Sequence, residues 1–425
     1  MNKVLIISYY FPPMGMGGVQ RTLKFAKYLK DFGWESVVIT DSPKKYYAVD
    51  ESLMKEAIEN DIKIERTGRE IKDIKDIVVK APNERVRKFR NFLSQLVFIP
   101  DSKIVWRKKA LAKIDEIWNK YGGFDLIFAT APPYTDFLIG QAVKKKYKIP
   151  LVVDYRDLWV DNKVLNSYPT YYHKMSNIRL EKKVLSEANK VIVTNRKTKE
   201  LLITRYGNVD YNDVKIFPHG YDQEDFDKAS KEVLPAAGKM RFLYSGSFYC
   251  YNPKPYFDSI KFLYDKYPEL EKEIEFCFLG QFTQEHIKYC QQIKIYDKIN
   301  IQGYKDHIEC IKYILSSDVL VLLKSKGENE IASMVGKVGE YIGSRKNILA
   351  LIPDGLTQKT LTEYGAVKFE GSEDPREISG AIYDYYKLYK ENKLPSAEED
   401  FVKQFNRKDM TDELATEFNY LLDIE

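Results

Sequence analysis

The chain has 425 residues, of which 44% are hydrophobic and 30% charged, a composition typical of a globular protein. This length predicts two domains, because a single compact core rarely grows beyond about 250–300 residues. The formal net charge of +5 is small for such a length, so we expect no nucleic acid among the partners.

The four cysteines all lie in the second half of the chain, and no two have the C-x-x-C spacing. They are Cys250, Cys277, Cys290 and Cys310. This distribution favours core thiols in a reducing compartment over a zinc site. No segment reads as a secretory signal peptide or as a bilayer-spanning run, so the expected location is the cytoplasm.

The first half of the chain alternates short apolar runs with helix-patterned stretches. The expected strands are Val4–Ser8, Ser36–Thr40, Leu126–Thr130, Leu151–Asp154 and Val191–Thr194. The helix-patterned stretches include Arg21–Phe32, Thr135–Tyr147 and Ile178–Ala188. Continuous β-branched runs joined by helices are typical of buried parallel strands.

A long glycine-containing loop, YYFPPMGMGGVQRT at positions 9–22, follows the first expected strand. A dehydrogenase fingerprint would place its glycines directly after the strand, and Gln20 stands where the third glycine would be. Asp41, after the second strand, keeps that alternative open as a ribose-binding acid, and an ordinary surface loop is another alternative. The loop length favours an anion held by the Gly17 and Gly18 amides at the N-terminus of the next helix.

An insert of about residues 46–121 separates the second and third expected strands. Within it, residues 85–109 combine an apolar stripe at helical spacing with many basic residues. The stripe is Phe89, Phe92, Leu93, Leu96 and Val97, and the basic residues are Arg85, Arg87, Lys88, Arg90, Arg107, Lys108 and Lys109. Such a helix can lie on an anionic membrane surface, which would make the protein peripheral on the inner membrane face. The alternative is that the stripe packs on the body of the domain.

The second half of the chain repeats the alternation, after turn residues and charges near Pro218–Pro235 that we take as the joint. The expected strands are Phe242–Ser245, Phe276–Leu279, Ile299–Gln302, Val319–Leu323 and Asn347–Leu351, and a helical stretch, Glu398–Leu422, follows. The two halves together predict an α/β protein with two Rossmann-like, doubly wound domains.

Several stretches, in order, resemble glycosyltransferase family 4, whose fold is GT-B. They are YFPPMGMGGVQRTLKFAKYL, FDLIFATAPPYTDFLIG, IPLVVDYRDLW, VKIFPHGYDQEDF, RFLYSGSFY, INIQGYKDHIECIKYILSSDVLVLLK and GKVGEYIGSRKNILAL. The second and third resemble a subgroup that modifies cell-surface polysaccharides and lipid-linked sugars. The resemblance covers about residues 1–50 and 120–355.

The resemblance implies two Rossmann-like domains facing across a cleft, with the C-terminal helix crossing back to the first domain. It assigns residues 1–217 and 405–425 to an acceptor-side domain and residues 218–404 to a donor-side domain. It further implies a retaining, metal-independent hexosyltransferase of polysaccharide biosynthesis. The donor would be a UDP- or GDP-linked sugar, the acceptor a glycan or polyprenyl-linked sugar, and no cofactor would be needed.

The resemblance places the donor diphosphate between the glycine loop and the glycine turn after the first strand of the second domain. The candidate donor-binding residues are Gly17, Gly18, Arg21, Gly246, Ser247, Lys254, Glu330, Lys337 and Glu340. Lys337 and Glu340 lie one helical turn apart, so Lys337 can face phosphate while Glu340 accepts hydrogen bonds from ribose. The family signature has a second glutamate eight positions earlier, where this chain has Ala332. Glu330 is therefore the candidate for the sugar hydroxyls.

The acceptor side carries three charged residues at the end of an expected strand, in VVDYRDLW. The candidates for catalysis are Asp154, Arg156 and Asp157, and a structural salt bridge is the alternative. Relatives often carry a histidine base where this chain has Ala131–Pro133. In a retaining enzyme an oxygen of the leaving phosphate can deprotonate the acceptor instead, so the missing base is compatible with the chemistry.

Two other functions remain open at this point. A GT-B sugar-nucleotide epimerase would use the same donor site, and a non-catalytic nucleotide-sugar-binding subunit would fit the displaced first glutamate. The D-x-D sequence Asp225–Asp227 falls on the crossover between domains, and the four histidines show no ligand spacing, so we expect no metal site.

Overall fold

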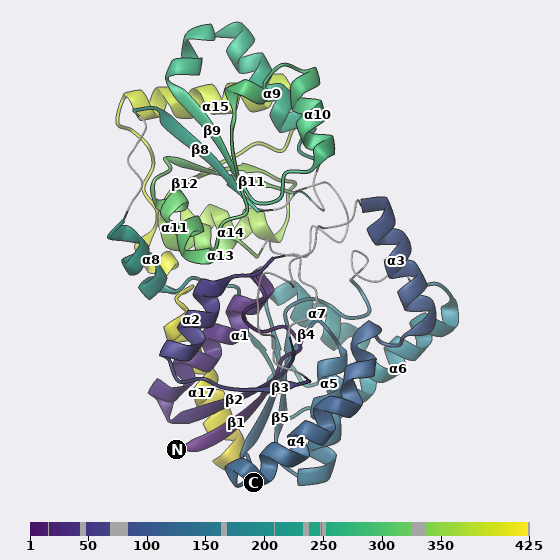
Figure 1. Cartoon of the computed structure of the whole chain (residues 1–425). Coiled ribbons are helices and arrows are strands. Elements are labelled where there is room, and N and C mark those ends of the chain that lie inside the picture. Colours follow the sequence, from purple (N-terminus) through teal and green to yellow (C-terminus); the bar gives the residue numbers. More distant parts are fainter. Residues whose placement is uncertain are drawn as a thin grey trace. The chain divides into compact units, whose positions relative to one another are not determined.

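The computed structural model describes residues 1–15, 17–42, 48–68, 84–162, 168–207, 209–232, 238–246, 248, 252–324 and 336–423. The chain forms two compact units (Figure 1). The first unit comprises residues 1–219 and 407–425, and the second comprises residues 220–406. The second unit is therefore one continuous piece of sequence inserted into the first.

The first unit is built on a parallel seven-stranded sheet with the order β3-β2-β1-β4-β5-β6-β7. The strands are β1 (Asn2–Ile7), β2 (Trp34–Asp41), β3 (Lys63–Thr67), β4 (Leu126–Ala131), β5 (Leu151–Tyr155), β6 (Lys190–Val193) and β7 (Val214–Ile216). The direction of the strand order reverses between β1 and β4, which is where open α/β sheets bind ligands.

Helices cover both faces of this sheet. They are α1 (Gly17–Tyr28), η1 (Leu29–Phe32), α2 (Glu51–Glu59), α3 (Glu84–Val97), η3 (Ser102–Trp106), α4 (Arg107–Tyr121), α5 (Thr135–Tyr147), α6 (Tyr171–Glu187), α7 (Arg196–Arg205) and α17 (Arg407–Asp423). On β1, Leu5 and Ile7 enter one apolar cluster while Val4 and Ile6 enter the other. Both faces of a central strand are thus buried, which explains the continuous apolar run in its sequence.

The C-terminal helix α17 completes the core of the first unit. Phe418 packs edge-on against Trp34, with ring centroids 5.3 Å apart, and lies in the same cluster as Phe128. The Trp34 indole nitrogen donates a 3.0 Å hydrogen bond to the Asn419 side chain. The expected return of the last helix to the first domain is confirmed.

The second unit is built on a parallel six-stranded sheet with the order β10-β9-β8-β11-β12-β13. The strands are β8 (Met240–Ser245), β9 (Ile274–Leu279), β10 (Asn300–Gly303), β11 (Val319–Leu323), β12 (Asn347–Leu351) and β13 (Val367–Phe369). Its helices are α8 (Gln223–Ser230), α9 (Lys254–Lys266), η4 (Pro268–Lys272), α10 (Gln284–Gln292), η5 (Tyr296–Lys298), α11 (His307–Leu315), α13 (Val338–Ser344), α14 (Leu356–Tyr364), α15 (Pro375–Lys390) and α16 (Glu399–Lys403). Here the order reverses between β8 and β11.

The predicted fold class is confirmed, and the differences follow from position in the sheet. The sequence missed β3, β7 and β13, and all three are edge strands. An edge strand has one neighbour and does not need the continuous apolar run that a central strand needs. The expected helix Glu398–Leu422 is interrupted, because the Phe405 carbonyl accepts a 2.9 Å hydrogen bond from the Tyr221 amide.

None of the helices that the structure describes combines the length and the apolar character needed to cross a membrane.

We expect Gly343→Ala to lower the free energy of unfolding by about 1–3 kcal/mol, because a Cβ at this position of α13 would lie 2.2 Å from Tyr221 Cγ. Gly380→Ala in α15 is the matched control, since a Cβ there meets nothing within 4 Å. That change should stabilise by about 1 kcal/mol through helix propensity. Urea denaturation of both variants measures the effects, and equal stabilities would contradict this packing.

Candidate functional site

In the first unit, the surface at the carboxyl ends of β1, β4 and β5 is organised around the start of α1. Gly18 is exposed in the first turn of that helix, where backbone N–H groups have no partner within the helix. The Arg156 guanidinium donates hydrogen bonds to the carbonyls of Gly18, Pro132 and Ala131. A Cβ on Gly18 would lie 3.2 Å from Arg156 Nη1, so glycine permits this close approach. A cation thus sits beside the positive end of a helix, which is an arrangement suited to an anion.

Arg21 and Asp154 form a fully buried ion pair beneath that surface. The Arg21 Nη2–Asp154 Oδ1 distance is 2.8 Å, and Arg21 Nε also donates to the carboxylate. Thr130 donates a 2.8 Å hydrogen bond to Asp154 Oδ2, and Arg21 Nη1 donates to the Pro218 carbonyl at 2.9 Å. Neither charged group reaches solvent, so the pair has the geometry of a structural salt bridge that positions its neighbours.

Asp157 is the acid of this group that reaches solvent. Desolvation by the surrounding protein raises the pKa of its carboxyl, and the charge of Arg156 opposes the rise. Because the side chain itself is exposed, solvent limits the shift and we take the carboxylate as charged at neutral pH. Among the three predicted catalytic residues, Asp157 is therefore the one whose carboxylate can contact a ligand directly.

A second acid lies beneath this surface. Asp136, in the first turn of α5, is fully buried; one oxygen accepts a 2.8 Å hydrogen bond from the Tyr9 amide, and the other has no hydrogen-bond partner. Burial raises the pKa of Asp136 well above its ordinary value. The sequence analysis missed this residue, although an acid inside the apolar stretch TDFLIG was a visible signal.

His219 lies among three guanidinium groups of the first unit. Desolvation lowers the pKa of this half-buried imidazole well below its ordinary value, and the charges of Arg21, Arg407 and Arg156 lower it further. The imidazole is therefore neutral at pH 7. Arg407, at the start of α17, could not be linked to this surface from sequence because nearly 200 residues separate it from His219.

In the second unit, three adjacent strands each end in a glycine with positive φ. These are Gly246 (φ 132°), Gly280 (φ 111°) and Gly303 (φ 70°), at the ends of β8, β9 and β10. A Cβ on Gly280 would lie 2.1 Å from the Gly246 carbonyl oxygen, so no side chain fits there. The turns are thereby brought close together, and the Gly246 and Gly280 amides donate to the Leu279 and Gly303 carbonyls at 2.9 and 2.8 Å.

Lys337 reaches over this glycine turn. Its ammonium donates a hydrogen bond to the Ser245 carbonyl, lies 4.0 Å from the centroid of the Tyr244 ring, and would lie 2.6 Å from a Cβ on Gly246. Desolvation lowers its pKa to about 7, opposed by Cys310 and Glu340. The prediction that Lys337 lies at the Gly246 turn agrees with these contacts.

Glu340 lies one helical turn from Lys337 and faces His307. The Glu340 Oε1–His307 Nδ1 distance is 3.7 Å, and His307 Nε2 lies 2.9 Å from Asp225 Oδ2. The histidine ring is buried, whereas the Glu340 side chain is partly exposed. His307, which the sequence did not single out, is thus held by Asp225 next to the carboxylate that we expect at the ribose.

The remaining predicted donor residues are not gathered here by the described contacts. Lys254, at the start of α9, is exposed and lies 4.9 Å from the centroid of the Tyr289 ring. Ser247 and Glu330 lie outside the described residues.

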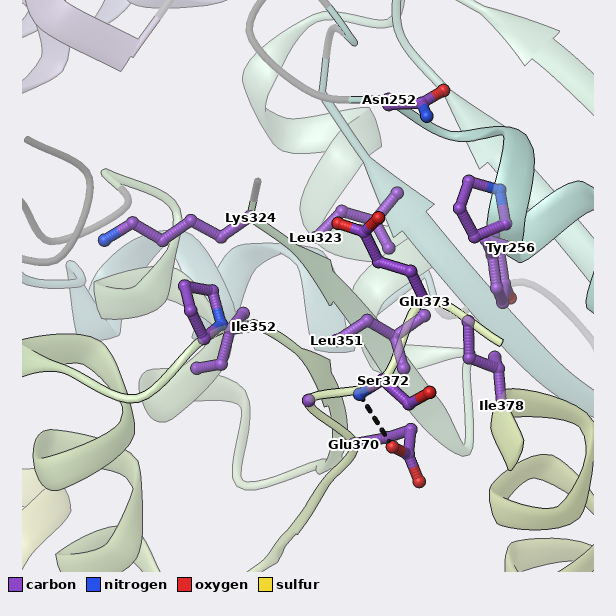
Figure 2. Close-up of a pocket in the computed structure, with 13 residues that line it drawn as sticks. Asn252, Tyr256, Leu323, Lys324, Leu351, Ile352, Glu370, Ser372, Glu373 and Ile378 are labelled. Atoms are coloured by element: carbon purple, nitrogen blue, oxygen red, sulfur yellow. Dashed lines mark hydrogen bonds between the residues drawn. The ribbon is translucent and has the colours of Figure 1, made fainter. Parts of the chain in front are cut away.

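A small cavity opens at the ends of β11 and β12 (Figure 2). Leu323 and Leu351 form its floor, and Lys324, Glu370 and Glu373 contribute charged groups. Its volume of about 50 Å³ is far below the roughly 300–1,000 Å³ of sites for small organic ligands. This cavity is therefore not the nucleotide site, and the open surface at Gly246, Lys337 and Glu340 is the better candidate.

The sequence profile of Glycosyltransferase Family 4 matches residues 16–225, which include the glycine loop, α1, Asp154 and Arg156. The chain carries a glycosyltransferase family 4 domain. No curated protein sequence matches the chain. The family resemblance read from the motifs is thus confirmed over residues 16–225.

Solved structures share the architecture of this chain at low sequence identity. Sucrose-phosphate synthase from Thermosynechococcus elongatus is 15% identical over the whole of both chains, with a TM-score of 0.65. UDP-GlcNAc 2-epimerase from Neisseria meningitidis bound to UDP-GlcNAc is 12% identical over 98% of this chain and 99% of its own, with a TM-score of 0.56. MnaA from S. aureus with UDP is 11% identical over 100% and 98%, with a TM-score of 0.55. These likenesses establish the GT-B fold.

We expect Asp154→Asn to destabilise the protein by about 3–5 kcal/mol, because it leaves the buried Arg21 charge without its carboxylate. Asp157→Asn is the matched control and should change stability by no more than about 0.5 kcal/mol, since its side chain is exposed. Chemical denaturation measures both. A stability loss below about 1 kcal/mol for Asp154→Asn would contradict the structural role of the pair.

The pKa of Lys337 predicts that donor affinity depends on pH. A bound diphosphate favours the ammonium form, so binding takes up a proton wherever the free lysine is neutral. Affinity for a UDP-sugar, whose phosphates do not titrate in this range, should be constant below pH 7. Above pH 7 it should fall by up to tenfold per pH unit.

Calorimetric titration between pH 6 and 9, in buffers of different ionisation enthalpy, measures both the affinity and the proton uptake. Lys337→Arg should remove the dependence, because a guanidinium stays charged throughout. A flat profile for the wild-type chain would contradict the predicted titration.

Proposed function

We propose that this glycosyltransferase moves a hexosyl group, with retention and without a metal ion, from a UDP- or GDP-linked sugar to a glycan or lipid-linked acceptor. The pathway would be cell-surface polysaccharide biosynthesis. The observation that carries the proposal is the group of Gly246, Lys337 and Glu340 at the strand ends of a GT-B second unit, in a chain with a family 4 domain. UDP and UDP-GlcNAc are named as ligands of proteins that share the fold.

In this proposal the second unit holds the donor. The backbone at Gly246 and Ser247 and the Lys337 ammonium bind the diphosphate, whose charge grows as the bond to the sugar breaks. Glu340, which lies 3.7 Å from His307, accepts hydrogen bonds from the ribose hydroxyls. Glu330 takes the sugar hydroxyls, and Lys254 supplies additional positive charge.

The first unit receives the acceptor. The Gly17 and Gly18 amides and Arg156 form an anion-binding helix terminus, which suits a phosphate of the donor or of a diphosphate-linked acceptor. Asp157 contacts an acceptor hydroxyl from its exposed position. Arg21 and Asp154 act as positioning residues, because both are fully buried.

The proton of the acceptor hydroxyl is taken by an oxygen of the leaving diphosphate. His219 does not act as the base in this scheme. Desolvation lowers the pKa of its imidazole, and the neighbouring guanidinium groups would repel the imidazolium product. Asp136 is fully buried and already accepts the Tyr9 amide hydrogen, so it does not reach the acceptor hydroxyl.

We expect Lys337→Met to weaken donor binding at least tenfold at pH 6 and to lower kcat/KM at least a hundredfold, because the diphosphate loses its cation. Lys346→Met is the matched control. This partly buried lysine follows α13 and precedes β12, at the opposite edge of the sheet from Lys337. It should retain donor binding and turnover, which calorimetry and nucleotide release measure.

The two alternative functions predict different outcomes with the same donor. A sugar-nucleotide epimerase would convert the donor without an acceptor, and NMR of the sugar would detect the epimer. A binding subunit would bind the donor and release no nucleotide with any acceptor tested. Acceptor-dependent nucleotide release with retained anomeric configuration supports the proposal, and either of the other outcomes contradicts it.

A further inference from the structure

Helix α3 turns its apolar residues toward solvent. Phe89 and Val97 are 63% and 72% exposed, and the other large apolar residues of the helix that the structure describes are exposed as well. These are Val86, Phe92, Leu93 and Leu96. Their positions recur every three or four residues, so they share one face of the helix. The predicted stripe therefore exists and is exposed, most strongly at Phe89 and Val97, while the other four residues are 39–46% exposed.

The side of α3 that is sheltered is polar. Among the described side chains of the helix, only Ser94 and Gln95 are partly buried, and none is fully buried. This is the reverse of an ordinary surface helix, which buries its apolar face and exposes its polar one. A contiguous exposed apolar face on one helix indicates a surface that binds an apolar partner.

The exposed apolar surface continues onto α6, which lies beside α3 (Figure 1). His173 Nε2 lies 3.2 Å from the Leu96 carbonyl oxygen and joins the two helices. The preceding residues, Tyr171 and Tyr172, are 76% and 67% exposed. Val105, in η3, is also exposed. We call this combined area of α3, η3 and the start of α6 the α3–α6 surface.

Positive charge borders the α3–α6 surface. Arg90 is exposed on α3, and Arg107, Lys108 and Lys109 are all exposed in the first turn of α4. The side chains of Arg85, Arg87 and Lys88 lie outside the described part of the chain. From Val86 to Lys109 the sequence contains one acid, Asp101, whose carboxylate accepts hydrogen bonds from Thr135 and the Lys103 amide. The exposed cations at 90 and 107–109 therefore outnumber the acids in this stretch of the sequence.

We propose that the α3–α6 surface inserts into the headgroup region of an anionic lipid bilayer. The phenylalanine, leucine and valine side chains enter the boundary between headgroups and acyl chains, as in other interfacial amphipathic helices. Tyr171 and Tyr172 lie at the headgroup level, where the apolar ring contacts the acyl chains and the hydroxyl group faces water. The cations at 90 and 107–109 pair with lipid phosphates. A second copy of the chain would satisfy the apolar residues but would bring the same cations together.

The test is flotation of the whole chain with vesicles, without donor or acceptor, so its result does not depend on the proposed transfer reaction. Vesicles of phosphatidylcholine with phosphatidylglycerol are compared with vesicles of phosphatidylcholine alone, at low and at high salt. We expect binding to the anionic vesicles that falls at least tenfold at 0.5 M NaCl, because salt screens the lipid contacts.

Paired variants separate the surface from general hydrophobicity. Phe89→Asp with Val97→Asp should lower vesicle binding at least tenfold, and Tyr171→Ser with Tyr172→Ser should lower it measurably. The controls are Ile58→Asp on α2, where Ile58 is 63% exposed, and the exposed Tyr211→Ser, and both should bind as the wild type does. All of these positions are exposed, so circular dichroism should show unchanged folding.

Charge reversal tests the cations separately. Arg107→Glu, Lys108→Glu and Lys109→Glu together should abolish the preference for anionic lipid, and acids in the first turn of α4 favour the helix. The control reverses the exposed Lys272, Lys288 and Lys294 of the second unit, with the same change in net charge. Absence of vesicle binding at low salt would overturn the proposal, as would equal binding by the α3 variant and the wild type. Self-association that the α3 variant abolishes, without vesicle binding, would also overturn it and assign the surface to a second copy.

Discussion

The buried ion pair between Arg21 and Asp154 is the constraint on which the strand-end surface of the first unit depends. It joins α1 to the end of β5, and through Thr130 and the Pro218 carbonyl it also fixes β4 and the chain after β7. A buried pair adds little net stability compared with apolar packing, because desolvation of both charges offsets their attraction. Its effect is geometric. With α1 held in place, the Gly18 carbonyl stays within hydrogen-bond reach of Arg156, and the helix terminus remains beside a cation.

In the second unit, the geometry of the strand-end surface depends on close backbone contacts rather than on a buried ion pair. Gly246 and Gly280 approach so closely that neither turn can shift without the other, and this leaves a defined space for the Lys337 ammonium. The Lys337 ammonium lies partly desolvated over the Tyr244 ring, and this desolvation disfavours the charged form and lowers the pKa. In the proposed function, a bound diphosphate would favour the ammonium form again.

The sequence predicted the repeated alternation of strands and helices and those strands whose apolar runs are continuous. Central strands such as Val319–Leu323 were placed correctly because both faces are buried and the apolar run is unbroken. The sequence spacing puts Lys337 and Glu340 one helical turn apart, and in the structure both lie at the start of α13. What the sequence could not show were contacts between distant segments, such as Arg407 with His219 and His307 with Asp225 and Glu340. It also could not decide which side of α3 faces the body, since periodicity defines a stripe but not its direction.

The return of α17 to the first unit has a consequence for the order in which the chain folds during synthesis. Residues 220–406 contain every strand and helix of the second unit, so that unit can close while the chain is still growing. Most of the first unit leaves the ribosome earlier. Its Trp34 and Phe128 rings nevertheless lack their packing partner Phe418 until α17 has been synthesised. The first unit is thus completed only once Arg407–Asp423 has been synthesised, after the whole of the second unit.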